Sequence, residues 1–286
     1  MAKTIQEVLD QMNDYMDIST NLAFSSKKKY SKIIRLFLLF CGMKFNGDTI
    51  NRFITEKNKN KNNYNYKYAF KYFLESIGQK KLYEGIKASK KKSRKKIFRH
   101  IPKEVLQNII NLLPNKYKTM AVIQLKTGCR FIELSTLRAE NIDFELSPDI
   151  IGITVGSGLS KSKGQKERKL ILHRKYESLL RTIIKKPYGY IFLDPKFEHY
   201  DEEKFFSGLE TVKRYYNREL SKAGNRLNIE HLSSHYLRHL FADYYLLAGG
   251  TAESLMKIMG HVKMDTTLVY VSVSEEMAQK TILKMG

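Results

Sequence analysis

Apolar residues in the first 80 positions recur at the spacing of amphipathic helices. One set follows the spacing i, i+3, i+4, i+7, i+8, i+11 and comprises Tyr30, Ile33, Ile34, Phe37, Leu38 and Cys41. A second set with the same spacing comprises Tyr66, Ala69, Phe70, Phe73, Leu74 and Ile77. Each set forms one apolar stripe, and shorter helices are expected over residues 5–16 and 49–56. The pattern predicts a bundle of about four or five helices with these aromatic side chains in its core rather than on a base-stacking surface.

The pattern changes after residue 100 and predicts strands as well as helices. Helices are expected over 106–113, 117–126, 173–185, 205–220, 234–248 and 255–259, with Pro114, Gly128 and Gly260 at three of their ends. Strands are expected over 150–155, 169–172 and 190–193. The fold class is therefore mainly α with a small β-sheet: an N-terminal helical bundle followed by an α+β domain.

A basic stretch separates the two patterns. Eight of the thirteen residues from Lys87 to Arg99 are basic, and hydrophobic periodicity stops there. Like charges repel, so this stretch is expected to be an extended linker, either a solvated tether or a segment that follows a DNA backbone. We divide the chain into a helical domain at 1–82, a linker at 83–99 and a second domain at 100–286.

The charge of the chain favours a polyanionic partner. The 51 Lys and Arg residues exceed the 29 Asp and Glu residues and give a net charge of +22. Nucleic acid is the favoured partner; an acidic membrane surface, or a lysine-rich composition without function, would give the same balance. The candidate DNA-binding residues lie in the first domain and in the linker: Lys27, Lys28, Lys29, Lys90, Lys91, Lys92, Arg94, Lys95 and Lys96.

Other compositional features exclude several classes of protein. No apolar run approaches the ~18 residues of a membrane span, and the N-terminus has no apolar signal core, which indicates a cytoplasmic location. Two cysteines, Cys41 and Cys129, make neither a disulfide framework nor a zinc site. Cys129 is expected to be a buried small residue rather than a reactive thiol.

The helix predicted over 234–248 carries a candidate phosphate site. His235, Arg238 and His239 follow the spacing i, i+3, i+4 and share a face near the helix start, where the helix dipole also favours an anion. A guanidinium donates in a planar fork that matches phosphate oxygens. From the residues alone, His239 is equally well a structural or a functional histidine.

Five motifs in order resemble those of tyrosine recombinases, in the Xer-like branch of that family. The segments are Thr127-Gly128-Cys129-Arg130-Phe131-Ile132-Glu133-Leu134, Lys163-Gly164-Gln165-Lys166-Glu167-Arg168, His235-Tyr236-Leu237-Arg238-His239, Met259-Gly260-His261 and Thr266-Thr267-Leu268-Val269-Tyr270. The resemblance covers residues 98–286, and the helical front half fits the core-binding domain of the family. It implies a two-domain, C-shaped clamp that works without metal, cofactor or ATP.

The resemblance also implies roles for six residues. Tyr270 is the expected nucleophile and would leave a 3′-phosphotyrosine and a free 5′-hydroxyl. Arg130 and Arg238 would bind the non-bridging oxygens, where charge develops. Lys163 would protonate the leaving oxygen, although Lys161 and Lys166 lie close by and Ser162 stands where the family has glycine. His235 would assist proton transfer from Tyr270, and His261 would bind the phosphate.

The resemblance implies a site-specific recombinase that resolves chromosome dimers or integrates and excises a mobile element. Its expected partner is double-stranded DNA with a specific recombination site. A tetramer on two duplexes is expected, and a monomer or dimer when the protein is free. The tail after Tyr270 would dock either on a neighbouring subunit or on its own domain. Two alternatives are a DNA-relaxing topoisomerase with the same chemistry and a catalytically silent DNA-binding regulator.

Overall fold

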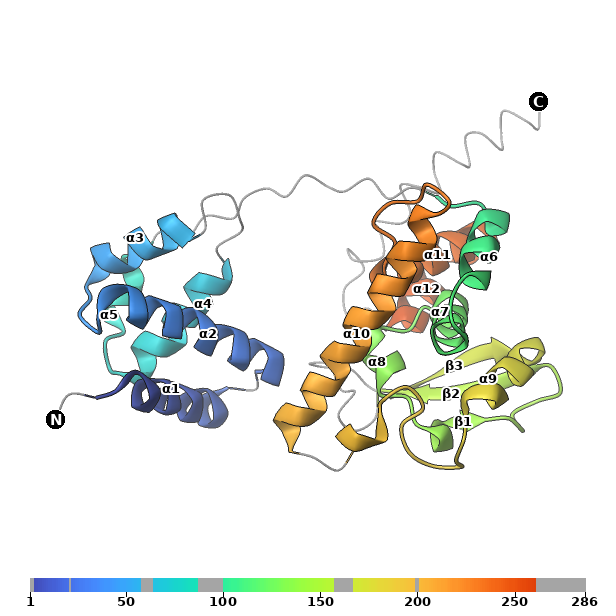
Figure 1. Cartoon of the computed structure of the whole chain (residues 1–286), viewed down its shortest axis with the longest axis horizontal. Helices are drawn as coiled ribbons and strands as arrows, with labels where there is room; N and C mark the ends of the chain where they lie inside the picture. Colours follow the sequence, from blue (N-terminus) through green and yellow to red (C-terminus); the bar gives the residue numbers. More distant parts are fainter. Residues whose placement is uncertain are drawn as a thin grey trace. The chain divides into compact units, whose positions relative to one another are not determined.

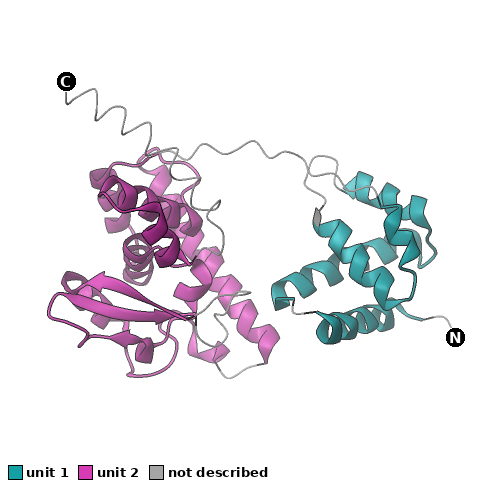
Figure 2. Cartoon of the chain, turned by 180° about the vertical axis from the view of Figure 1, so that it is seen from behind, with its two compact units in different colours: residues 1–96 teal, residues 97–286 magenta. Residues whose placement is uncertain are grey.

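The chain folds into two compact units, residues 1–96 and 97–286, coloured separately in Figure 2. The computed structural model describes residues 3–20, 22–57, 64–86, 100–156, 167–198 and 201–260. In this part of the chain, no helix is both long and apolar enough to span a membrane. The fold class is as the sequence predicts, mainly α with one small sheet (Figure 1).

The described part of the first unit contains five helices. They are α1 (Ile5–Ser19), α2 (Phe24–Cys41), α3 (Gly47–Lys57), α4 (Tyr64–Ser76) and α5 (Lys81–Glu84). The Phe37 ring lies at the centre of the core, with its centroid 4.8 Å from Phe70 and 5.3 Å from Phe45 and from Phe53. The aromatic stripes thus form the core of the helical bundle, as predicted.

The second unit packs its helices around one central helix, with a small antiparallel sheet at one side. Its helices are α6 (Lys103–Asn111), α7 (Asn115–Thr127), α8 (Phe131–Ser135), α9 (Glu177–Ile183), α10 (Glu202–Asn225), α11 (Ser234–Leu247) and α12 (Ala252–Met259). The sheet has the order β1-β2-β3, with β1 at Ile142–Asp143, β2 at Ile150–Val155 and β3 at Arg168–His173. Helix α7 is the central helix: it contacts α6, α9, α11 and β3 and is buried along most of its length.

In this unit one predicted strand was wrong, and one predicted helix has different bounds. Residues 190–193 do not form a strand; Tyr190 makes only an isolated bridge to Arg138, while Phe192 and Leu193 are buried in the core. An apolar run reports burial, which does not require strand pairing. The third strand is β1, which at two residues is too short for a periodic signal. The helix expected over 173–185 begins later, because His173 caps a 3₁₀ turn, Arg174–Tyr176, that precedes α9.

Candidate active site

The loop between α7 and α8 approaches α11 closely at Gly128, which has no side chain. Gly128 ends α7 in a left-handed conformation with φ 66°, and a Cβ atom there would lie 2.3 Å from Cδ1 of Phe241 on α11. Glycine is therefore favoured here for two reasons: it adopts the left-handed conformation readily, and it leaves room for the Phe241 ring. The close approach lets Arg238 of α11 donate to the carbonyl of Gly128, two residues before Arg130.

Arg130 lies at the start of α8, with 27% of its side chain exposed. Its backbone N–H donates to Oε2 of Glu133 at 2.7 Å, and its Nη2 donates to the carbonyl of Gly260 at 2.7 Å. Burial lowers the pKa of Arg130 from its usual value, yet a guanidinium stays charged in proteins. The side chain thus combines a fixed position with access to solvent.

Arg238 is buried, although the sequence predicts that it shares a phosphate-binding face of α11 with His235 and His239. The residue is 5% exposed, and its Nη1 and Nη2 donate to the carbonyls of Gly128 and Met259, the latter at 2.7 Å. These carbonyls stabilise the buried charge, which a hydrophobic pattern cannot predict.

The two histidines of the motif form a pair at the start of α11, which Ser233 caps. Their Nε2 atoms lie 2.9 Å apart, with His235 exposed and His239 partly buried. Partial desolvation of the ring, with a smaller contribution from Arg238, lowers the pKa of His235. Burial and the neighbouring His235 lower the pKa of His239 to about 4. Both imidazoles are therefore neutral at neutral pH, and one ring must donate to the other.

Three arginines bind three successive carbonyls at the C-terminus of α12. Arg168 donates from Nε to Ile258 at 3.0 Å, Arg238 donates to Met259, and Arg130 donates to Gly260. The last carbonyls of a helix have no partner within the helix, and its dipole places partial negative charge there. The three guanidinium groups provide hydrogen-bond donors for these carbonyls and positive charge for the helix dipole. The same hydrogen bonds hold Arg130 and Arg238 beside adjoining peptide groups.

A buried carboxylate completes this cluster. The Glu133 side chain is 0% exposed and forms a two-pronged pair with Arg168, at 2.6 and 2.9 Å. Glu133 and Arg168 had no separate role among the residues predicted from the sequence. A signal was present for Glu133, since an acid between Ile132 and Leu134 is unusual in an apolar segment. Arg168 stands between Glu167 and Lys169 and gave no such signal.

Cys129 is 1% exposed, and burial raises the pKa of its thiol to about 12. The prediction of a buried small residue is confirmed.

Three predicted catalytic residues, Lys163, His261 and Tyr270, lie outside the described residues, as do the basic residues predicted between Lys90 and Lys96. Within the described ranges, no three His, Cys, Asp or Glu side chains gather as a metal site.

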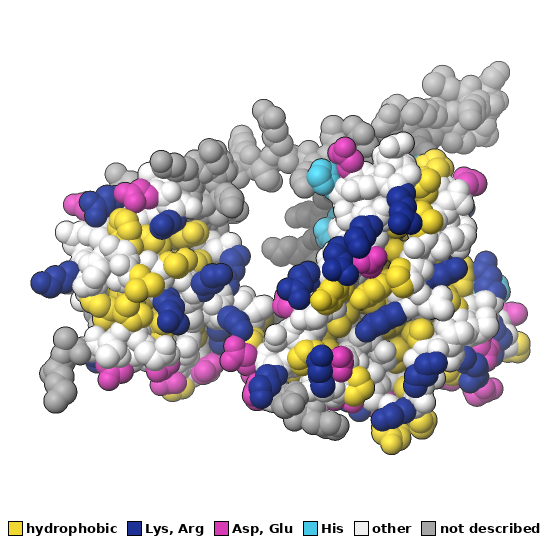
Figure 3. Space-filling model, in the orientation of Figure 1, with side chains coloured by type: hydrophobic (Ala, Val, Ile, Leu, Met, Phe, Trp, Pro, Cys, Tyr) yellow, Lys and Arg dark blue, Asp and Glu magenta, His cyan; other side chains and the backbone are white. Residues whose placement is uncertain are grey.

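Basic side chains gather on α2 and α10. Lys28 and Lys29 are exposed on α2, whereas Lys27 forms an ion pair with Asp17. On α10, basic side chains follow the helix across the face shown in Figure 3, with histidine side chains beside them. This set, which was not predicted from the sequence, comprises Lys213, Arg214, Arg218 and Lys222 on α10 and Arg226 at its C-cap. Its signal was a basic face opposite the apolar stripe of that helix.

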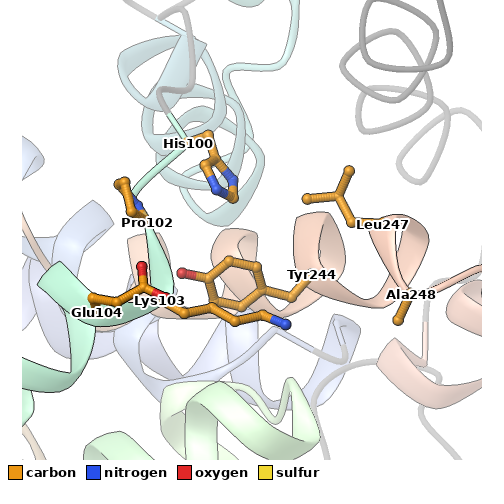
Figure 4. A pocket seen from close by; sticks show the side chains of 7 residues that line it. All are labelled: His100, Pro102, Lys103, Glu104, Tyr244, Leu247 and Ala248. Atoms are coloured by element: carbon orange, nitrogen blue, oxygen red, sulfur yellow. The ribbon is translucent and has the colours of Figure 1, made fainter. Parts of the chain in front are cut away.

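The other half of α11 meets the first described residues after the linker. His100, Lys103 and Tyr244 line an open pocket there (Figure 4). Nδ1 of His100 is hydrogen bonded to the buried carboxylate of Asp243, and the Tyr244 hydroxyl donates to the carbonyl of Ile101. The segment 100–101 is thus attached to the same helix that carries His235 and Arg238.

Comparisons with known proteins match the region of the chain that contains the five motifs. A model of the phage integrase family matches residues 99–277. The chain is 24% identical over 306 residues to a tyrosine recombinase of Thermosipho africanus, covering 95% of this chain and 97% of that protein. It is 25% identical over 170 residues to tyrosine recombinase XerC of Oceanobacillus iheyensis, covering 55% of this chain and 49% of that protein.

Solved structures show the same fold at lower identity. XerH site-specific recombinase bound to difH substrate, in a pre-cleavage complex, matches with a TM-score of 0.66 and 17% identity, covering 97% of this chain and 84% of that one. The Tn1549 transposon integrase in complex with transposon right end DNA matches with a TM-score of 0.60, 15% identity and coverage of 95% and 98%. Both units of this chain therefore have counterparts among these folds.

Proposed function

The chain belongs to the phage integrase family and is a tyrosine recombinase, and from this premise we propose that Tyr270 is its nucleophile. The Tyr270 oxygen attacks the scissile phosphorus, the bond from phosphorus to the 5′-oxygen breaks, and a 3′-phosphotyrosine forms. Attack by a 5′-hydroxyl on that link reverses the step and rejoins a strand. The covalent link retains the phosphodiester energy, so no ATP is needed.

The observation that carries this proposal is the placement of Arg130 and Arg238. Their guanidinium groups bind the adjoining carbonyls of Gly260 and Met259, immediately before His261 in the sequence. Two fixed cations there suit the two non-bridging oxygens of one phosphate, where negative charge builds in the transition state. His261 adds a hydrogen bond to the same phosphate.

Proton transfer is assigned to His235 and Lys163. An unperturbed tyrosine has a pKa of about 10, so attack at neutral pH requires a base. His235 is exposed and its pKa is lowered, so its ring is neutral and accepts the proton of Tyr270. Lys163 donates a proton to the leaving 5′-oxygen. The arginines and this lysine provide the positive charge that a metal ion supplies in other phosphoryl-transfer enzymes.

The partner is double-stranded DNA with a specific recombination site. Lys28 and Lys29 on α2, the basic set on α10 and the linker lysines Lys90 to Lys96 contact the phosphate backbone. Four protomers assemble on two duplexes, in the cytoplasm where the DNA lies. The solved structure of the Tn1549 integrase, which is in complex with transposon right end DNA, supports DNA as the ligand.

The test is the capture of a covalent adduct on nicked suicide duplexes. A duplex is first selected from a randomised library by its covalent retention on the wild-type chain. Tyr270→Phe should abolish the adduct, because phenylalanine has no attacking oxygen. Tyr188→Phe is the matched control, since Tyr188 is 66% exposed and lies outside the site, and it should form adduct at the wild-type rate. Adduct formation by Tyr270→Phe would refute the assignment.

A further inference from the structure

Arg168 contacts the candidate active site without being one of its proposed catalytic residues. It is the first residue of β3, and 13% of its side chain is exposed. Nη1 and Nη2 donate to the two carboxylate oxygens of Glu133, and Nε donates to the carbonyl of Ile258. All three nitrogens of this guanidinium are therefore hydrogen bonded to groups beside Arg130 and the end of α12.

Glu133 is shared between two arginines in an unequal way. Its Oε1 accepts from Arg168 at 2.6 Å but from the Arg130 guanidinium only at 3.4 Å. Its Oε2 accepts from Arg168 at 2.9 Å and from the backbone N–H of Arg130 at 2.7 Å. Glu133 thus makes its short contacts between charged side chains with Arg168, and its carboxylate holds the Arg130 side chain only weakly.

This inequality matters because a buried carboxylate requires a compensating cation. Removing one partner of a buried ion pair is strongly destabilising, because the remaining charge is left uncompensated. Without Arg168, the nearest guanidinium to Glu133 is that of Arg130. The Arg130 side chain would then rotate towards Glu133 and form the bidentate ion pair itself. Fewer of its N–H groups would be directed to a phosphate.

We propose that Arg168 is a positioning residue that neutralises Glu133 and thereby keeps the guanidinium of Arg130 available to the scissile phosphate. The proposal rests on the phosphate-binding role proposed above for Arg130. It assigns the charge of Arg168, rather than its bond to Ile258, as the property that cleavage requires. A lysine at 168 retains that charge but lacks the planar fork and the Nε–H.

Four variants of the full chain separate these effects: Arg168→Lys, Arg168→Met, Glu133→Gln and the double variant Arg168→Met/Glu133→Gln. The measurements are the single-turnover rate of adduct formation at saturating protein, the affinity for the same duplex and the melting temperature. The probe is the nicked duplex selected on the wild-type chain. Arg168→Met should lower the rate about 10- to 100-fold, with little change in affinity. This is less than the roughly 100- to 1000-fold cost of removing one oxyanion contact, because Arg130 is displaced rather than removed.

The double variant provides the decisive comparison. Glutamine at 133 carries no charge to attract Arg130, so Arg168→Met/Glu133→Gln should be at least about fivefold faster than Arg168→Met alone. Arg168→Lys retains the charge but not the bidentate geometry, so its rate should lie between those of wild type and Arg168→Met. The proposal is overturned if the double variant is as slow as Arg168→Met, or if Arg168→Lys is as slow as Arg168→Met while its melting temperature equals that of wild type.

Failure of the proposed function would look different. In that case the wild-type chain retains no duplex from the library, and no variant can be compared with it. A slow but measurable Arg168→Met variant whose rate does not respond to Glu133→Gln instead leaves the function intact and refutes only the role of Arg168. Melting temperatures distinguish a variant that unfolds from one with a misplaced Arg130.

Discussion

His235 and His239 lie one turn apart on α11, with their Nε2 atoms 2.9 Å from each other. Since both rings are neutral at neutral pH, one Nε2 carries a hydrogen and the other accepts it. The ring of His239 therefore fixes the orientation of the ring that we assign to proton transfer. Protonation of the accepting ring at Nε2 would place two N–H groups against each other, and protonation of both rings would place two charges side by side.

This pair predicts a loss of stability in acid. The pKa of His239 is about 4 in the folded chain, below its usual value of 6.5, so the unfolded chain takes up a proton first as the pH falls. The contribution of His239 to stability is thus complete above about pH 6.5 and is lost as the pH falls towards 4. Urea denaturation at pH 7, 6 and 5 measures the free energy of unfolding. Between pH 7 and pH 5 this free energy should fall by about 1–2 kcal/mol less in His239→Gln than in wild type, after allowance for partial exposure of the ring.

His231→Asn is the control for this measurement. The His231 side chain is 85% exposed, and asparagine tolerates the left-handed backbone at that position, where φ is 60°. Its pH dependence should match that of wild type. If His239→Gln also matches wild type at every pH, the lowered pKa of His239 is refuted.

Gly128→Ala is predicted to destabilise the second unit by about 2–4 kcal/mol, because it combines overpacking with backbone strain. The new methyl group would lie 2.3 Å from Cδ1 of Phe241, at a residue with φ 66°. Gly249→Ala is a matched control in the same unit, since Gly249 has φ 90° and a methyl group there would meet no neighbouring atom within 4 Å. Thermal unfolding should show a clearly smaller loss for the control, of about 1 kcal/mol. Equal losses would exclude the contact with Phe241 as a cause.

Much of the fold was predictable because its signals are local. Helices with one apolar face, such as α2 and α4, appear in the spacing of their aromatic residues, and the strand predicted over 150–155 is β2 with the same bounds. The error over 190–193 has a physical origin. Phe192 and Leu193 are buried by tertiary contacts, and burial gives an apolar run whether or not the backbone pairs.

The internal connections of the site were less predictable. Glu133 and Arg168 are 35 residues apart in the sequence, and Arg130 and Gly260 are 130 apart. Hydrogen bonds over such separations leave no periodic pattern. The motif spacing indicated which residues belong to the site, whereas the carbonyls that hold their side chains became visible only in the folded chain.

Two neighbouring lysines of α2 are predicted to differ in DNA binding. Lys29 is exposed, whereas Lys27 is paired with Asp17 and has 23% of its side chain exposed. Lys29→Gln should lower the slope of log affinity against log salt by about 1, as loss of one phosphate contact does. Lys27→Gln should change the slope by less than about 0.3. Fluorescence anisotropy with the selected duplex over a range of KCl concentrations measures both slopes, and equal slopes for the two variants would contradict this difference.

His100 is predicted to stabilise α11 through Asp243. The Asp243 side chain is 5% exposed and is hydrogen bonded to Nδ1 of His100, so His100→Ala leaves a buried carboxylate without this partner. The expected loss is about 1–3 kcal/mol. Native-state hydrogen exchange of the α11 amides measures it locally, without requiring the two units to unfold together.

Lys103→Ala is the matched variant for His100→Ala, because Lys103 lines the same pocket (Figure 4). Its Nζ lies 5.9 Å from the centroid of the Tyr244 ring, a contact worth about 0.5–1 kcal/mol at an exposed site. If the stabilisation by His100 depends on the Asp243 carboxylate, it should be smaller in an Asp243→Asn background. His100→Ala should then lower the stability of α11 by less in that background than it does alone. If His100→Ala opens α11 no more than Lys103→Ala does, the hydrogen bond to Asp243 does not stabilise the helix, and packing in the pocket accounts for both losses.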